Sequence, residues 1–205
     1  MYIFFMKEAN LCESSYKIQY SWEEYFNIPI PWKQVYSLPY KLTIDTHTRM
    51  FQYKLLFKFL TVNKTLFTWG LVNSPTCSLC NEEEETIIHL FWDCRIVARF
   101  WSEVDGWFFN LTNTHLHINA FNIVFGDLSD RCPVLSNLFI LLGKIYILKY
   151  REKTLHLSGF ISYVSYVQQL EYIIAKRLDK TQKYWESGEN YVLSFQHKSF
   201  LSLCI

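Results

Sequence analysis

The chain has 205 residues, of which 50% are hydrophobic, 19% are aromatic and 19% are charged. This balance excludes a disordered chain, and a content of only six glycines and five prolines excludes a collagen-like or linker-like one. The formal net charge of +1 excludes a protein that is polybasic throughout, although residues 81–106 hold two basic against seven acidic residues and form an acidic centre.

Hydrophobic spacing predicts helices in the first part of the chain. Residues 22–26 fit one or two helical turns, and Pro31 fits the first position of a further short helix. Asp45 or Thr46 is a suitable N-cap for a helix that runs to about residue 59, with Phe59 on its apolar side.

Further elements follow on both sides of the acidic centre. Asn63 is the expected N-cap of a short helix over residues 64–69. Residues 118–125 are apolar and partly β-branched, which favours an extended segment. Long helices are expected over about residues 133–150 and 160–178, because apolar residues recur there every three to four positions.

Four residues in and next to the acidic centre form a pattern that indicates a metal site. Cys77 and Cys80 are separated by two residues, His89 follows after eight more, and Cys94 after another four. Three thiolates and one imidazole are the donor set of a closed, tetrahedral zinc site. We therefore predict that Cys77, Cys80, His89 and Cys94 bind one structural zinc ion as cofactor.

Two other interpretations of these cysteines stay open at this point. Free cysteines are often buried core residues, and a C-x-x-C pair at a helix start after a strand is typical of redox proteins. The remaining cysteines, Cys12, Cys132 and Cys204, are scattered along the chain. This distribution indicates a metal site in a reducing compartment and not a disulfide framework.

The spacing of the last two donors constrains the local fold. On one unbroken α-helix, His89 and Cys94 would point about 140° apart, because the helix has about 3.6 residues per turn. We therefore predict a short helix over residues 86–92, a break near Cys94 and a second helix to about residue 104, with Asp93 as its N-cap. The four glutamates at residues 82–85 predict a solvated loop before His89.

The sequence predicts an intracellular protein, cytoplasmic or nuclear, that is neither secreted nor inserted in a membrane. The apolar start of the chain ends at Lys7 and is too short for a signal peptide. The longest apolar stretch, residues 134–150, contains two lysines and falls short of the about 20 apolar residues that a membrane helix needs.

The residues around the motif also resemble a known family. The similarity is continuous over about residues 40–104 and looser over residues 122–126 and 140–151. It rests on the sequences of residues 51–57, 60–67, 70–80, 83–94 and 100–101. In order and distance they resemble the zinc-binding domain of reverse transcriptases, at the C-terminal end of the polyproteins of non-LTR (LINE-type) retrotransposons.

This resemblance implies a non-catalytic accessory domain that helps to bind the RNA or the target DNA of the element. The Asp-Asp pair of the polymerase has no counterpart in the sequence, so we expect no enzyme activity, no catalytic residue and no small-molecule substrate. The chain would be a fragment of a reverse transcriptase polyprotein. Two alternatives are a structural or protein-interaction module that packs on the polymerase or another protein, and a non-functional relic of a truncated element.

Basic and aromatic residues outside the acidic centre are candidates for nucleic-acid contacts. The basic candidates are Lys54, Lys58, Lys64, Lys149, Arg151 and Lys153, with Lys144 as a further one. The aromatic candidates are Tyr53, Trp69, Trp92 and Trp101. The run of glutamates argues against a direct phosphate contact at the metal site itself.

Together these patterns predict a mainly α protein, in which a small zinc-stapled helical domain is followed by a long-helix C-terminal region. Residues 1–40 would be an N-terminal connecting segment, residues 41–112 the zinc-binding helical domain, and residues 113–205 the C-terminal helical region.

Overall fold

The computed structural model describes residues 9–129 and 134–178, with side chains from residue 16 onward. Within these residues the helical elements are α1 (Ala9–Phe26), α2 (Trp32–Leu42), α3 (Thr46–Leu56), α4 (Asn63–Thr68), the π-helical turn η2 (His89–Asp93), α5 (Arg95–Thr112), α6 (Ala120–Phe125), α7 (Val134–Tyr150) and α8 (Leu157–Leu178). Extended pairing in the described part is limited to an isolated bridge between Thr76 and Glu84. The prediction of a mainly α protein is confirmed.

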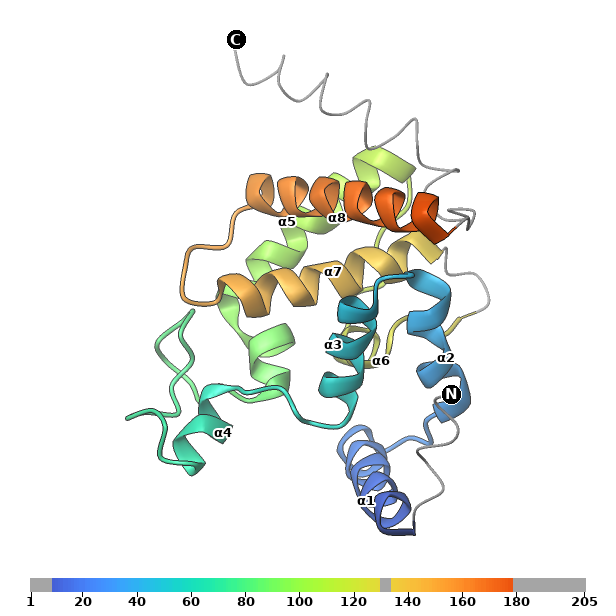
Figure 1. Ribbon diagram of the computed structural model, residues 1–205. Coiled ribbons are helices and arrows are strands. Elements are labelled where there is room, and N and C mark those ends of the chain that lie inside the picture. The colour runs from blue at the N-terminus through green and yellow to red at the C-terminus, as the bar shows by residue number, and fades with distance from the viewer. Residues whose placement is uncertain (1–8, 130–133, 179–205) are drawn as a thin grey trace.

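Helix α7 lies at the centre of the fold. It packs against α2, α3 and α6 on one side, and against α8 and η2 elsewhere on its circumference (Figure 1). All of its residues from Ser136 to Lys144 are buried. A helix that is apolar on every side is expected to be enclosed by other elements, and α7 follows this rule.

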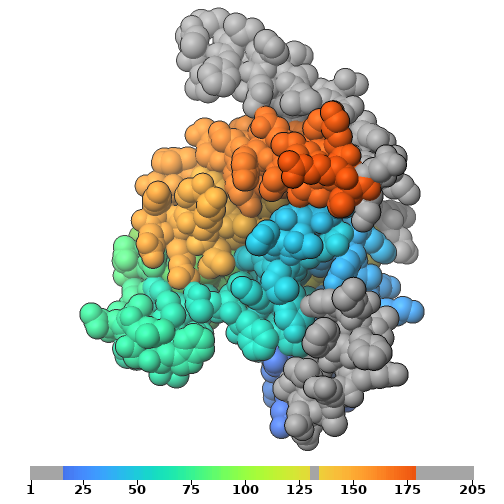
Figure 2. All heavy atoms as spheres, in the orientation of Figure 1, coloured from blue at the N-terminus to red at the C-terminus, as the bar shows by residue number. Residues whose placement is uncertain are grey.

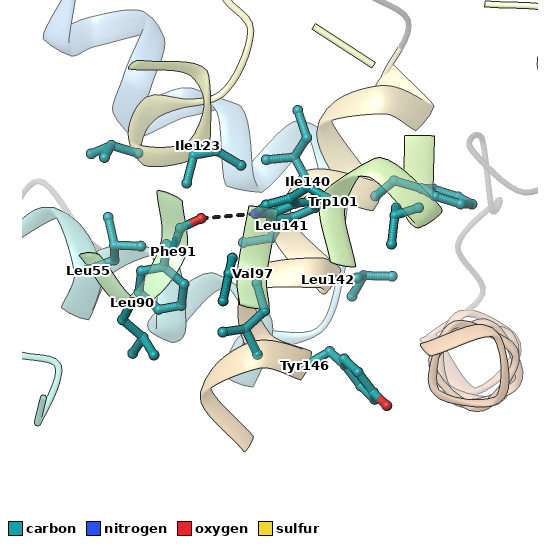
Figure 3. Packing of buried hydrophobic residues seen from close by; sticks show 14 of the residues in the cluster. Leu55, Leu90, Phe91, Val97, Trp101, Ile123, Ile140, Leu141, Leu142 and Tyr146 are labelled. Carbon is teal, nitrogen blue, oxygen red and sulfur yellow. Dashed lines mark hydrogen bonds between the residues drawn. The ribbon is translucent and has the colours of Figure 1, made fainter. Parts of the chain in front are cut away.

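One hydrophobic core connects the described residues from α1 to α8. Figure 3 shows its middle, where side chains of α3, η2, α5, α6 and α7 meet. Trp101 Nε1 donates a hydrogen bond of 2.9 Å to the carbonyl of Phe91, which joins α5 to η2. The same cluster of buried residues runs from Trp22 to Val167, so the three expected parts share one core. The boundaries at residues 40 and 112 stay predictions.

The first two helices are longer than their sequence indicates. Helix α1 begins at Ala9, and α2 continues to Leu42. The indole of Trp22 is buried, and its Nε1 donates a hydrogen bond of 2.8 Å to the carbonyl of Leu56. Such tertiary contacts supply most of the stability of short helices, and they cannot be predicted from the local spacing of apolar residues.

Two expectations about local structure are wrong. Helix α3 ends at Leu56 and not near residue 59, because the chain turns at Lys58 with a φ of 55°, and Phe59 is therefore 60% exposed. Residues 118–125 are not extended but contain α6, whose N-cap Asn119 accepts a hydrogen bond from the backbone N–H of Asn122. The capping asparagine outweighs the β-branched residues that follow it.

The later helices agree with the expected ranges. Helix α7 covers Val134–Tyr150, while Pro133, expected to open it, lies outside the described residues. Helix α8 covers Leu157–Leu178 and packs on α7. No helix in the described ranges combines the length and the apolar character that crossing a membrane requires.

Candidate metal centre

The first two cysteines lie in a turn that is closed by backbone hydrogen bonds. The N–H of Cys77 donates to the carbonyl of Glu83 over 2.8 Å, and the N–H of Asn81 donates to the carbonyl of Cys77 over 2.9 Å. Asn81 has a φ of 56°, a conformation that asparagine adopts more readily than most residues. The turn therefore presents Cys77 and Cys80 from one short, tightly folded segment.

The last two donors come from a π-helical turn. The N–H of Cys94 donates to the carbonyl of His89 over 2.9 Å, which is the i to i+5 hydrogen bond of a π-helix. Cys94 itself has extended backbone angles, and α5 begins at Arg95. The predicted break at Cys94 is confirmed. Asp93 is not the N-cap of α5, since that position belongs to Cys94.

The four donor atoms lie together in the interior. All four residues are buried, and one ligand atom of each lies within 4.8 Å of the others. Cys80 Sγ and His89 Nε2 are 3.4 Å apart. Ordinary zinc–sulfur and zinc–nitrogen bonds in a tetrahedron place the donor atoms about 3.5–3.8 Å apart. The cluster of Cys77, Cys80, His89 and Cys94 thus has the donors and the compactness that a metal ion requires.

The thiols of Cys77 and Cys94 form a hydrogen-bonded pair. The hydrogen bond from Cys77 lowers the pKa of the Cys94 thiol, and the backbone N–H groups of Val97 and Ile96 at the start of α5 lower this pKa further, although burial opposes them. The same hydrogen bond raises the pKa of Cys77. Metal binding requires both thiols to lose their protons, and the surroundings of Cys94 favour this loss.

The second nitrogen of His89 faces a carboxylate. Nδ1 is buried and makes no hydrogen bond, yet it lies 3.2 Å from Oε2 of Glu83. Histidines that bind a metal through one nitrogen usually direct the other toward a carboxylate, carbonyl or water. With Nε2 toward the cysteines and Nδ1 toward Glu83, His89 has the orientation of a metal ligand.

The run of four glutamates is not only a solvated loop. Each glutamate lies near a nitrogen atom of a different element. These pairs are Glu82 with Arg95 at 2.7 Å, Glu83 with His89 at 3.2 Å, Glu84 with Lys64 at 2.7 Å, and Glu85 with Arg151 at 2.9 Å. The first three glutamates are exposed as expected, but Glu85 is fully buried, which corrects the expectation for that residue.

Glu85 replaces the expected cap of α4. Its carboxylate accepts hydrogen bonds from the backbone N–H groups of Asn63 and Ser78, over 3.0 and 3.1 Å, and from Arg151. Asn63 is therefore not the N-cap; its side chain donates to the carbonyl of Thr76 and to Ser78 Oγ. No spacing rule relates Glu85 to an arginine 66 residues later, so sequence reasoning missed this pair.

The six basic candidates do not form one patch. Arg151 and Lys153 follow the end of α7; Arg151 contacts Glu85, and Lys64 contacts Glu84 in the same loop. Arg151 is mostly buried, because Nη1 donates to the carbonyl of Thr61 as well as to Glu85.

The other three candidates are Lys54 on α3, Lys58 shortly after α3 and Lys149 in the last turn of α7. Lys58 sits over the ring of Trp22 at 4.4 Å and donates to Ser21 Oγ, and partial burial lowers its pKa. Lys149 lies near the rings of Tyr150 and Tyr163, and Lys54 is exposed on α3.

The aromatic candidates also differ in exposure. Trp69, which ends α4, is 60% exposed, and its neighbours Phe67 and Leu71 are exposed as well. Trp101 is buried in the core, and Tyr53 and Trp92 are half-buried. Among these four candidates, Trp69 offers the largest exposed fraction.

Comparison with known proteins agrees with this geometry. Residues 12–101 match the model of a family described as zinc-binding in reverse transcriptase, and this range includes all four donor residues. Among curated proteins, none matches the chain. The match begins inside α1, and so it includes most of the segment expected to be a connection. Residues 12–101 are therefore similar to the zinc-binding domain of reverse transcriptases, over a match that covers less than half of the chain.

Proposed function

We propose that Cys77, Cys80, His89 and Cys94 bind one zinc ion with a structural role. The site is closed, because the protein supplies four donors and all of them are buried. Catalytic zinc sites keep a position open for water or substrate, whereas structural sites do not. The ion would fasten the Cys77 turn to the start of α5.

Zinc content tests this part of the proposal. Protein purified without chelator should contain about one zinc ion per chain. Cys80→Ser should lose the ion, since one missing thiolate opens the tetrahedron, whereas Cys132→Ser should keep it, because Cys132 lies outside the motif. Absence of zinc in the unmodified protein, or the absorption of an iron–sulfur cluster, would refute the assignment.

We further propose that the chain is a non-catalytic accessory domain of a retrotransposon reverse transcriptase, of the LINE type, which binds the RNA or target DNA of the element. The observation that supports nucleic-acid binding most is the segment around α4. Residues 46–81 contain four basic residues and no acidic one, and this segment carries the exposed Phe67 and Trp69. Figure 2 shows α4 and the loop after it as a lobe that projects from the body.

The exposed residues of this lobe suit the binding of single-stranded nucleic acid. Exposed aromatic rings stack on unpaired bases, and nearby lysines contact phosphates. The glutamates repel phosphate less than their number indicates, because each lies next to a basic side chain or a histidine. Lys153 is an exposed cation two residues after Arg151, which is itself paired with Glu85.

Binding to single-stranded RNA and DNA of random sequence tests the role. Trp69→Ala should weaken binding by about tenfold, since stacking of one base on an aromatic ring contributes about 1–3 kcal/mol. Tyr166→Ala is the matched control, because Tyr166 is an aromatic residue of α8 with 58% exposure. Lys54→Gln and Lys153→Gln should each reduce the slope of log affinity against log salt by about 0.7.

Four outcomes would each contradict a part of the proposal. Equal effects of Trp69→Ala and Tyr166→Ala would show that the α4 lobe is not the binding surface. Binding without salt dependence, or no binding at all, would remove the nucleic-acid role. Primer extension by the chain above background would contradict the non-catalytic part.

A protein-interaction module is the second candidate, and α8 favours it. This helix exposes Tyr166, Tyr172, Ile173 and Leu178. Such a face suits packing on a polymerase domain or another protein. A larger effect of Tyr166→Ala than of Trp69→Ala on binding to a polymerase domain would support this candidate.

A further inference from the structure

We propose that Arg151 and Glu85 are positioning residues for the metal centre, so that the end of α7 holds the Cys77–Cys80 turn in its ligating geometry. The inference rests on the proposed zinc site and extends it to a residue far outside the motif. Arg151 lies 66 residues after Glu85 in the chain and is not among the four donors.

The contacts of Glu85 connect three segments. Its Oε2 accepts from the N–H of Ser78, which lies between the two cysteines of the turn. Its Oε1 accepts from the N–H of Asn63, at the start of α4, and from Nη1 of Arg151. The carboxylate is thus the common partner of the cysteine turn, α4 and the residue after α7.

Backbone hydrogen bonds fix Glu85 itself next to the same turn. Its N–H donates to the carbonyl of Pro75 over 2.8 Å, and its carbonyl accepts from the N–H of Lys64 over 3.2 Å. A displacement of Glu85 would therefore move the turn at Ser78 and the residue that leads into it, Pro75. Because Glu85 is fully buried, its charge needs a partner that stays in place.

Arg151, the residue directly after the central helix α7, supplies that partner. Its side chain is only 14% exposed, and Nη1 also donates to the carbonyl of Thr61 over 2.8 Å. The other ion pairs of Arg or Lys with the glutamate run, Glu82 with Arg95 and Glu84 with Lys64, are exposed, and exposed pairs contribute little. The buried pair is the one that can determine the position of the turn.

The test measures zinc release from the full chain. Zinc-loaded protein is mixed with an excess of a chromophoric chelator, and the release rate is followed by absorbance. Arg151→Met should release zinc about 10–100 times faster, because removal of groups that orient metal ligands weakens metal affinity about 10–100-fold and we expect this loss in the release rate. Arg95→Met, which removes the exposed pair with Glu82, should stay within about twofold of the unmodified protein.

A second readout separates a local effect from unfolding. Hydrogen exchange of Arg151→Met should show faster exchange over residues 74–86 and unchanged protection in α8. If protection of α8 is lost as well, Glu85→Gln decides, because it keeps the side-chain shape but removes the charge. Faster release from Glu85→Gln supports the inference, and an unchanged rate overturns it.

The result that overturns the inference directly is equal release from Arg151→Met and Arg95→Met with α8 intact. This outcome leaves the proposed zinc site untouched. If the unmodified protein holds no zinc, the proposed zinc site fails first, and this inference falls with it.

Discussion

Lys144 of α7 is buried in the interior, where its side chain reaches α3. Its Nζ donates a hydrogen bond of 2.6 Å to Oε1 of Gln52, whose amide in turn donates to the carbonyl of Val124. The side chain is 2% exposed, and burial lowers the pKa of Lys144 to about 7. At neutral pH the lysine is therefore poised between its charged and neutral forms.

This shift predicts how stability depends on pH. Between about pH 7 and pH 10, the unfolded chain holds a proton on Lys144 that the folded chain has released. The free energy of unfolding should therefore rise with pH in this window, by at most about 1.4 kcal/mol per pH unit, and level off below pH 7. Urea unfolding of the unmodified protein and of Lys144→Met, both with zinc, measures this contribution as their difference.

The exposed Lys149 provides the control. Lys149→Met should unfold with the same pH dependence as the unmodified protein, because Lys149 lies at the surface of the same helix. A constant difference between the unmodified protein and Lys144→Met from pH 7 to pH 10 would contradict the lowered pKa.

The sequence predicts the position of some residues in the fold better than that of others. The four donors could be chosen in advance because their chemistry and spacing are local, and the structure brings their ligand atoms within 4.8 Å. Lys144 was expected at the surface, where lysines usually lie, and was a candidate phosphate contact. Its burial depends on α7 being surrounded, and Glu85 likewise depends on Arg151, which local patterns do not show.

At the scale of elements, α5 and α7 approach each other closely at Gly143. A Cβ atom on this glycine would lie 2.4 Å from Cη2 of Trp101, which is far inside contact distance. The indole is fixed on its other side by the hydrogen bond to the carbonyl of Phe91. The ring therefore cannot move away without breaking the contact between α5 and η2.

Gly143→Ala should accordingly destabilise the protein by about 1–3 kcal/mol, as overpacking of a filled core does. Gly106→Ala is the matched control inside α5, where an added Cβ meets nothing within 4 Å. It should raise stability by about 0.5–1 kcal/mol, because alanine loses less backbone entropy in a helix. Thermal unfolding of both variants checks this, and a neutral Gly143→Ala would show that the ring can shift.

Helices with a regular spacing of apolar residues could be predicted from the sequence. Helices whose bounds depend on one hydrogen bond or one cap could not. The ranges of α7 and α8 follow from their spacing of apolar residues. The break at Cys94 follows from the needs of a shared ion, but the π-helical turn that achieves it has no local signature in the sequence. Helix α6 begins at the capping side chain of Asn119, and this single contact is hard to recognise beside an apolar run that favours an extended segment.

At the scale of the molecule, the metal centre and the C-terminal helices form one unit. Helix α7 contacts η2, which holds His89, and α8 contacts α5, whose first residue follows Cys94. Buried side chains of α3, η2, α5, α6, α7 and α8 belong to one cluster. The sequence indicates where helices lie, but it does not show which helix faces pack against each other. The division of the chain into domains depends on this packing, so it is the prediction that local sequence supports least.

The predicted boundary at residue 112 can be tested by truncation. A fragment of residues 41–112 keeps all four donors but loses α7 and α8, which cover the buried faces of α3, η2 and α5. It also loses Arg151, the partner of Glu85.

With zinc present, we expect this fragment to unfold without a cooperative transition and to bind a dye specific for exposed apolar surface. A chain that ends at residue 178 is the control, because it keeps every helix of the described part, and it should unfold as cooperatively as the full chain. Cooperative unfolding of the 41–112 fragment would instead establish residue 112 as a true domain boundary and would show that the zinc ion replaces the support that the long helices give.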